Sequence, residues 1–135
     1  AKTLFPYTTL FRSINDHFGH AAGDEVLRRI AGVLRANLRH NDLAARIGGE
    51  EFVILLPETQ LADAAQHAER LRKAIAGLRI PVEQSMLSVT VSIGVAVLDE
   101  TTTNFDALIN KADHALYQAK HLGRNRTVIE NQNQA

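Results

Sequence analysis

The sequence predicts an α/β sandwich, in which helices flank a mixed, mostly antiparallel sheet. Two observations support this prediction: segments with helical spacing of apolar residues alternate with short apolar segments, and two of the short segments flank a Gly-Gly pair. With 135 residues, 45% of them hydrophobic, the chain is long enough to bury one core as a single domain.

Three segments show apolar residues at helical spacing with charged residues between them. They are residues 22–39, 61–76 and 105–121. We expect Thr59 to cap the second helix and Gly123 to end the third. Each helix would then bury one apolar stripe against the sheet.

The strands are predicted from shorter patterns. Residues 43–47 and 52–56 flank Gly48 and Gly49, and glycine tolerates the positive φ of a tight hairpin turn. Residues 87–97 alternate apolar with small or polar side chains, which predicts one strand with a face in the core. Residues 127–129 could add a last strand, and residues 131–135 form a polar tail that we expect to fray.

The composition excludes several classes of function. Lys plus Arg and Asp plus Glu both number 15, so no overall charge draws the chain to nucleic acid or an anionic membrane. The chain has no cysteine, which excludes disulfides and cysteine metal sites and is compatible with the cytoplasm. The sequence shows no membrane-spanning run or signal peptide, and its six histidines lack metal-ligand spacing.

Several stretches in a fixed order resemble the GGDEF family of diguanylate cyclases. They are residues 11–27, 46–52, 89–96, 112–120 and 123–125. The resemblance implies a ferredoxin-like, nucleotidyl-cyclase-type sheet and the condensation of two GTP into cyclic di-GMP with release of pyrophosphate. It also implies a homodimer for catalysis, normally fused to a sensor domain and working in the cytoplasm.

The reaction explains the residues after the Gly-Gly pair. An in-line attack on an α-phosphate depends on neutralised charge, and Mg²⁺ needs only one or two carboxylates beside the phosphates. By resemblance, Gly48 and Gly49 lie against the phosphates and Glu50 is the metal ligand (Mg²⁺ or Mn²⁺) that helps to deprotonate the attacking hydroxyl. Glu51 supports the metal and the substrate; without the flanking motifs, the pair reads equally well as solvated hairpin glutamates.

The resemblance also implies the substrate-binding residues. Guanine offers two donors beside acceptors, so an amide and a carboxylate select it over adenine. The family places that pair at Asn15 and Asp24, with Phe11 and Leu27 in the same substrate site. Taken alone, Asp24 reads as a carboxylate favoured near a helix start and Asn15 as a turn residue.

Cations match two further family sites. Lys120 and Arg124 match the phosphate-binding cations, although cations at a helix end are common without such a role. Arg39 and Asp42 match the RxxD inhibitory motif that binds the product, with Arg70 as its second arginine. A solvated helix end is the alternative reading of RxxD.

The first ten residues depart from the family pattern. The family carries metal-binding aspartates on its first strand, and counting back from Asn15 places them at Tyr7 and Thr9. Pro6 is also a poor residue for a central strand. We therefore expect a degenerate first strand, a non-family segment over 1–10, the GGDEF domain over 11–130, and strongly reduced cyclase activity. The resemblance thus describes a truncated domain or one with a foreign start.

Two other readings remain open. The domain could bind cyclic di-GMP or GTP without making the product, as a degenerate binding module. It could also be an unrelated ferredoxin-like regulatory domain, if the motif matches arise by chance. Binding without turnover distinguishes the first reading from an enzyme.

Overall fold

The computed structural model describes residues 2–7, 18–46, 51–99 and 104–130. The strands are β1 (Lys2–Tyr7), β2 (Leu43–Arg46), β3 (Phe52–Leu56), β4 (Ile80–Val82), β5 (Ser85–Leu87), β6 (Ser92–Val97) and β7 (Thr127–Ile129). The helices are α2 (His20–Asn37), α3 (Leu61–Ala76) and α4 (Phe105–His121). The second and third predicted helices have the predicted bounds, and the first is displaced by two residues.

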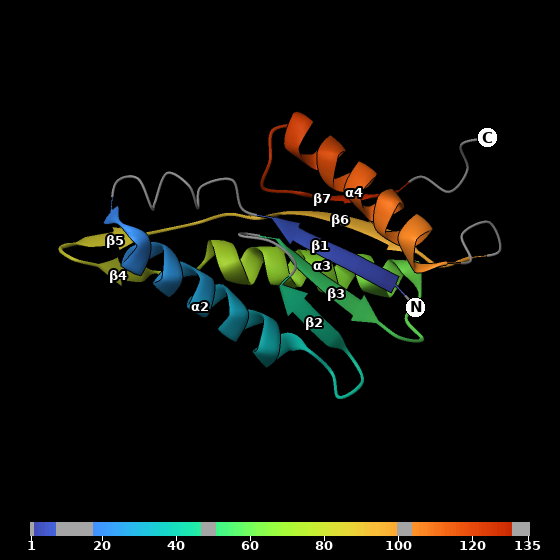
Figure 1. Cartoon of the computed structure of the whole chain (residues 1–135), viewed down its shortest axis with the longest axis horizontal. Helices are drawn as coiled ribbons and strands as arrows, with labels where there is room; N and C mark the ends of the chain where they lie inside the picture. Colours follow the sequence, from blue (N-terminus) through green and yellow to red (C-terminus); the bar gives the residue numbers. More distant parts are fainter. Residues whose placement is uncertain (1, 8–17, 47–50, 100–103, 131–135) are drawn as a thin grey trace.

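Five strands form one sheet in the order β2-β3-β1-β6-β7. β6 and β7 pair in parallel, whereas the other three pairings are antiparallel. Helices lie on both faces, with α2 and α3 on one side and α4 on the other (Figure 1). The predicted α/β sandwich with a mixed, mostly antiparallel sheet is confirmed.

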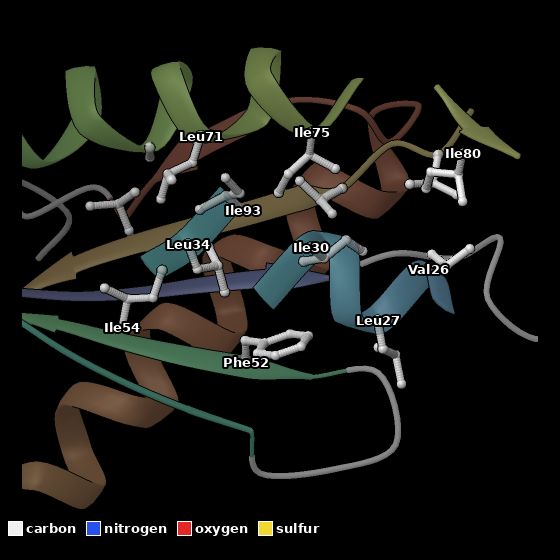
Figure 2. Packing of buried hydrophobic residues seen from close by; sticks show 14 of the residues in the cluster. Val26, Leu27, Ile30, Leu34, Phe52, Ile54, Leu71, Ile75, Ile80 and Ile93 are labelled. Carbon is white, nitrogen blue, oxygen red and sulfur yellow. The ribbon is translucent and has the colours of Figure 1, made fainter. Parts of the chain in front are cut away.

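The larger core lies between the sheet and the helices α2 and α3. Ile30 and Leu34 of α2 and Leu71 and Ile75 of α3 point toward Ile54 and Ile93 of the sheet (Figure 2). All six side chains are almost completely buried. Burial of this apolar surface, at about 25 cal/mol per Å², is the main force that holds α2 and α3 in place.

The smaller core lies under α4. Its buried members are Val53, Ala96, Leu108, Ala112 and Leu116. Gly94 of β6 allows the helix to approach, since a Cβ there would lie 2.2 Å from the carbonyl oxygen of Ala112. The backbone of α4 therefore packs directly on β6, and this contact fixes where the C-terminal end of α4 lies.

We read Pro6 as a poor residue for a central strand, and the structure shows why the strand accepts it. β1 is the middle strand, and Pro6 lies opposite Ile93. The amide of Ile93 donates to the carbonyl oxygen of Arg126, on the β7 side, so Pro6 and Ile93 form a non-hydrogen-bonded pair. The register of β1 with β3 ends at Leu4, so the missing N–H of Pro6 interrupts neither ladder.

Two smaller predictions were wrong. The predicted strand 87–97 is divided, because Leu87 belongs to β5, which pairs with β4, whereas pairing with β1 begins only at Ser92. Thr59 does not cap α3: the N-cap is Gln60, without a side-chain cap bond. The Thr59 hydroxyl instead donates to the carbonyl oxygen of Pro57 and accepts from the Arg39 guanidinium.

Candidate functional site

Several strand ends meet at one edge of the sheet. β1 runs antiparallel to β3 and β6, so the end of β1 at Tyr7 lies at the same edge as the starts of β3 at Phe52 and β6 at Ser92. β7 is parallel to β6, which brings Thr127 to that edge as well. We call this the active edge. The segments that precede and follow these strand ends carry most of the predicted site residues.

β2 and β3, which flank the Gly-Gly pair in the sequence, form one end of the active edge. β2 and β3 lie side by side (Figure 1), and Arg46 pairs with Phe52 at this edge. Glu51 is half-buried and directly precedes Phe52. Gly48, Gly49 and Glu50 lie outside the described residues, as do Phe11 and Asn15. Among the catalytic and metal residues that we predicted, Glu51 is the one that the structure describes.

A cavity of about 390 Å³ lies between the first half of α2 and the paired ends of β2 and β3. It is lined by Asp24, Leu27, Arg28, Ala31, Arg46 and Phe52. The carboxylate of Asp24 is exposed, whereas Leu27 is buried and Arg28 forms an ion pair with Glu25. The structure therefore brings two predicted substrate residues, Asp24 and Leu27, to one cavity with Arg46 and Phe52 at the ends of β2 and β3.

Arg46 and Phe52 belong to the stretch 46–52 that resembles the family, but we had not predicted them as site residues. Their place in this cavity depends on how the hairpin packs against α2. That packing is a tertiary contact, and the spacing of residues along the chain gives no direct signal for it.

The C-terminal end of α4 lies at the other end of the active edge. The amide of Arg124 donates to the carbonyl oxygen of Ala119 at 2.9 Å, and the amide of Gly123 to that of Lys120 at 3.4 Å. With φ of 119° at Gly123, these bonds form a Schellman motif, which confirms Gly123 as the helix stop. Lys120 is half-buried and Arg124 is exposed, just before β7.

A second cavity of about 460 Å³ lies between the end of α2 and the start of α3. It is lined by Ala36, Asn37, Leu38, Arg39, Asp63, Gln66, His67 and Arg70. The structure thus brings Arg39 and Arg70 together, as the predicted product site requires. Two arginines that line one cavity are suited to an anion with several acceptor oxygens.

Asp42 is placed behind Arg39. Its carboxylate accepts the backbone amide of Arg39 at 2.8 Å and lies 3.5 Å from the Arg39 Nε. The Asp42 side chain is only 2% exposed, and Asp42 is not one of the described residues that line the cavity. In this structure Asp42 fixes the turn that presents Arg39.

His67 is a buried member of this cavity that sequence reasoning missed as a site residue. Its Nε2 lies 2.8 Å from the carbonyl oxygen of Asn37, which joins α3 to the end of α2. Burial lowers the pKa of His67, and the positive charges of Arg70 and Arg39 lower it further. The neutral imidazole therefore donates to Asn37. The available sequence signal was the three-residue spacing of His67 and Arg70, which places both residues on one face of α3.

Comparison with known proteins decides the family. Residues 4–126 match the family described as "Diguanylate cyclase, GGDEF domain". The chain belongs to the GGDEF family. The match covers most of the chain and includes part of the segment 1–10 that we had expected to lie outside the family pattern.

Curated relatives of this GGDEF domain are much longer proteins. It is 48% identical over 120 residues to the response regulator PleD of Caulobacter vibrioides, covering 87% of this chain and 26% of that protein. It is 49% identical over 119 residues to the diguanylate cyclase DgcP of Pseudomonas aeruginosa, covering 88% and 18% respectively. The chain therefore spans about a quarter or less of these relatives.

Solved GGDEF structures share the fold of this domain. The active GGEEF domain of a diguanylate cyclase from Vibrio cholerae superposes with a TM-score of 0.91 at 33% identity, covering 98% of this chain and 83% of that one. The GGDEF domain of DgcB from Caulobacter crescentus, in complex with c-di-GMP, gives a TM-score of 0.91 at 29% identity and coverages of 96% and 77%. The sheet and its flanking helices are those of the family.

Proposed function

We propose that this GGDEF domain is the catalytic part of a diguanylate cyclase, which condenses two GTP into cyclic di-GMP and releases pyrophosphate. The observation that carries the proposal is the arrangement of the active edge. The Asp24–Leu27 cavity lies beside the ends of β2 and β3 on one side, and Lys120 and Arg124 lie beyond the other. The named relatives that are diguanylate cyclases support the same reaction.

The dimensions of the active edge suit a nucleoside triphosphate. β3 and β7 are three strand positions apart, which corresponds to roughly 14 Å at the usual strand spacing. With the base in the cavity beside Asp24, the phosphates would extend past Glu51 toward Lys120 and Arg124 at the C-terminal end of α4. Asp24 would accept the guanine N1 and N2 donors, a pair that adenine lacks.

A divalent metal ion belongs to this proposal. Among the described residues, no group of three His, Asp or Glu side chains could hold a metal ion. Glu51 together with the adjacent Glu50 matches the one or two carboxylates with which Mg²⁺ or Mn²⁺ binds beside substrate phosphates. The ion would neutralise charge on the phosphates, while Glu50 would take the proton of the attacking hydroxyl.

Two subunits are needed for the product, because each would hold one GTP. We infer a homodimer in which two active edges face each other around a two-fold axis.

The reaction would take place in the cytoplasm, under the control of a sensor domain in the full-length protein. Among the described residues, no helix is both long and apolar enough to cross a membrane.

The test of Glu51 is formation of cyclic di-GMP from GTP and Mg²⁺. It is best made in a Tyr7→Asp, Thr9→Asp background, which restores the first-strand carboxylates of the family. Glu51→Gln should reduce the rate at least about 100-fold, as expected when a charge-stabilising group is lost. Glu58→Gln, an exposed glutamate just beyond the far end of β3, should leave the rate unchanged. Equal rates for both variants would contradict the proposal.

A second candidate function, binding of cyclic di-GMP, rests on the cavity with Arg39 and Arg70. This function would make the domain a product-inhibited enzyme if turnover occurs and a receptor if it does not. Titration of cyclic di-GMP by calorimetry distinguishes the two when combined with the turnover measurement. Arg39→Ala should weaken binding at least tenfold, about the effect of one lost charge-assisted bond, whereas exposed Lys73→Ala should not.

A further inference from the structure

The segment after α4 has an unusual backbone. Arg124 has φ of 63° and Asn125 has φ of 47°, so two consecutive residues other than glycine adopt the left-handed region. Residues with a Cβ seldom adopt this conformation, because the Cβ then lies too close to the following carbonyl oxygen. Asparagine tolerates it, but arginine has no local compensation. Such a turn persists only where surrounding contacts hold it.

Arg72 of α3 supplies the principal contact from outside the segment. Its Nη1 donates to the Oδ1 of Asn125 at 2.7 Å and to the Asn125 carbonyl oxygen at 3.4 Å. Its Nε is held by the Glu69 carboxylate at 2.7 Å, and the Arg72 side chain is only 16% exposed. A planar guanidinium fixed at one end by an ion pair gives the contact with Asn125 a defined direction.

Two further contacts complete the turn. The amide of Asn125 donates to the Ser92 hydroxyl at 3.2 Å, at the start of β6 on the active edge. The Nε of Arg126 donates to the carbonyl oxygen of Arg124 at 3.1 Å. Asn125 therefore joins α3 to the first residue of β6. Arg124 directly precedes Asn125, so these contacts define where the Arg124 backbone lies.

We propose that Arg72 is a positioning residue, which holds Asn125 in the left-handed turn and thereby directs Arg124 toward the phosphates of the nucleotide. This inference rests on the proposed function, because it needs Arg124 to bind phosphate. Arg72 itself acts from α3 through Asn125 and does not contact the substrate. Without it, the exposed Arg124 would sample several backbone conformations and would bind the phosphates less tightly.

The experiment is a double-mutant cycle on GTP affinity, measured by calorimetry with Mg²⁺ on the whole chain. Arg72→Ala should weaken GTP binding about tenfold, close to the loss from Arg124→Ala. In the Arg124→Ala background, Arg72→Ala should have no further effect. Lys73→Ala, which removes an exposed cation from the next position of α3, is the matched control and should bind GTP like the wild type.

Amide hydrogen exchange at Asn125 provides a readout that does not depend on nucleotide. Arg72→Ala should accelerate this exchange at least tenfold while the amides of the α3 core keep their protection. If Arg72→Ala unfolds the domain, Asn125→Gly is the substitute. It keeps the left-handed turn and α3 but removes the Oδ1 acceptor, and it should weaken GTP binding several-fold.

The outcomes separate the inference from the proposed function. A loss of affinity in Arg124→Ala, but not in Arg72→Ala or Asn125→Gly, would overturn the inference alone. Additive losses in the double variant would also overturn it. Unchanged GTP affinity in Arg124→Ala would contradict the phosphate-binding role of Arg124 and, with it, the positioning role of Arg72.

Discussion

Tyr7, the last residue of β1, lies directly opposite Ser92, the first residue of β6. This register places Tyr7 at the middle of the active edge, between the start of β3 and the start of β6. The family resemblance implies a metal-binding aspartate at this position and another at Thr9. The chain therefore has a family-like sheet whose central strand ends without the expected carboxylate.

The close contact between β6 and α4 makes Gly94 sensitive to substitution. A Cβ at Gly94 would lie 2.2 Å from the Ala112 carbonyl oxygen and 2.5 Å from the Leu116 amide nitrogen, both backbone atoms. We expect Gly94→Ala to lower the free energy of unfolding by about 3 kcal/mol or more, because the helix must shift. Urea denaturation measures the loss. Gly32→Ala, in open space on α2, is the control and should not destabilise the domain.

Thr127, at the start of β7, has a buried hydroxyl without a hydrogen-bond partner among the described residues. Thr127→Val replaces that hydroxyl with a methyl group of similar size. We expect a gain of about 1 kcal/mol in the free energy of unfolding, since an unsatisfied buried group is removed. Thr59→Val removes a hydroxyl that bonds to Pro57 and Arg39, so it should destabilise the domain. If thermal unfolding shows that both variants change the stability of the domain in the same direction, this explanation is contradicted.

His67 should make stability dependent on pH. Its pKa is lowered in the folded state, chiefly by burial, from an unfolded value of 6.5. Between 6.5 and the lower folded pKa, the unfolded chain binds more protons, so stability falls as pH falls through this range. Above 6.5 the contribution of His67 is fully present. Urea midpoints at pH 7.5 and 5.5 should therefore differ more in the wild type than in His67→Gln, which keeps a donor for Asn37 but does not titrate. Equal differences would exclude His67 as a source of the effect.

Asp42 should affect product binding without touching the product. Its carboxylate holds the backbone amide and lies near the Nε of Arg39, and it does not line the described part of the cavity. Asp42→Ala should cost about 1–3 kcal/mol of stability and weaken cyclic di-GMP binding, because Arg39 loses its position. Calorimetric titration below the unfolding temperature measures the affinity. Asp106→Ala, at an exposed position, is the control. If Asp42→Ala and Asp106→Ala bind cyclic di-GMP with the same affinity, the positioning role of Asp42 is contradicted.

The helices and the outer strands could be predicted from sequence because their signals are local. α3, α4 and β7 have the predicted bounds, and the apolar periodicity of α3 and α4 ends near Gly77 and Gly123. β1 could not be judged locally. Pro6 is tolerated because Ile93 turns its amide toward β7, a relationship that involves three strands.

The residues of the candidate site were also predicted only in part from the sequence. Asp24, Leu27, Arg39 and Arg70 were predicted from the family resemblance, and the structure brings each pair to a cavity. His67 and Arg72 were missed as site or positioning residues, because their importance comes from contacts with Asn37 and Asn125. Such contacts depend on packing between elements that are distant in the sequence.

The most direct test of the account compares cyclic di-GMP formation by the wild type and by Tyr7→Asp, Thr9→Asp, with GTP and Mg²⁺ under identical conditions. We expect the substituted chain to form product at least about 100-fold faster, because a complete carboxylate set would hold the metal ion that neutralises charge at the phosphates. Both proteins should bind cyclic di-GMP equally at Arg39 and Arg70. A wild type that turns over GTP as fast as the substituted chain would contradict the account.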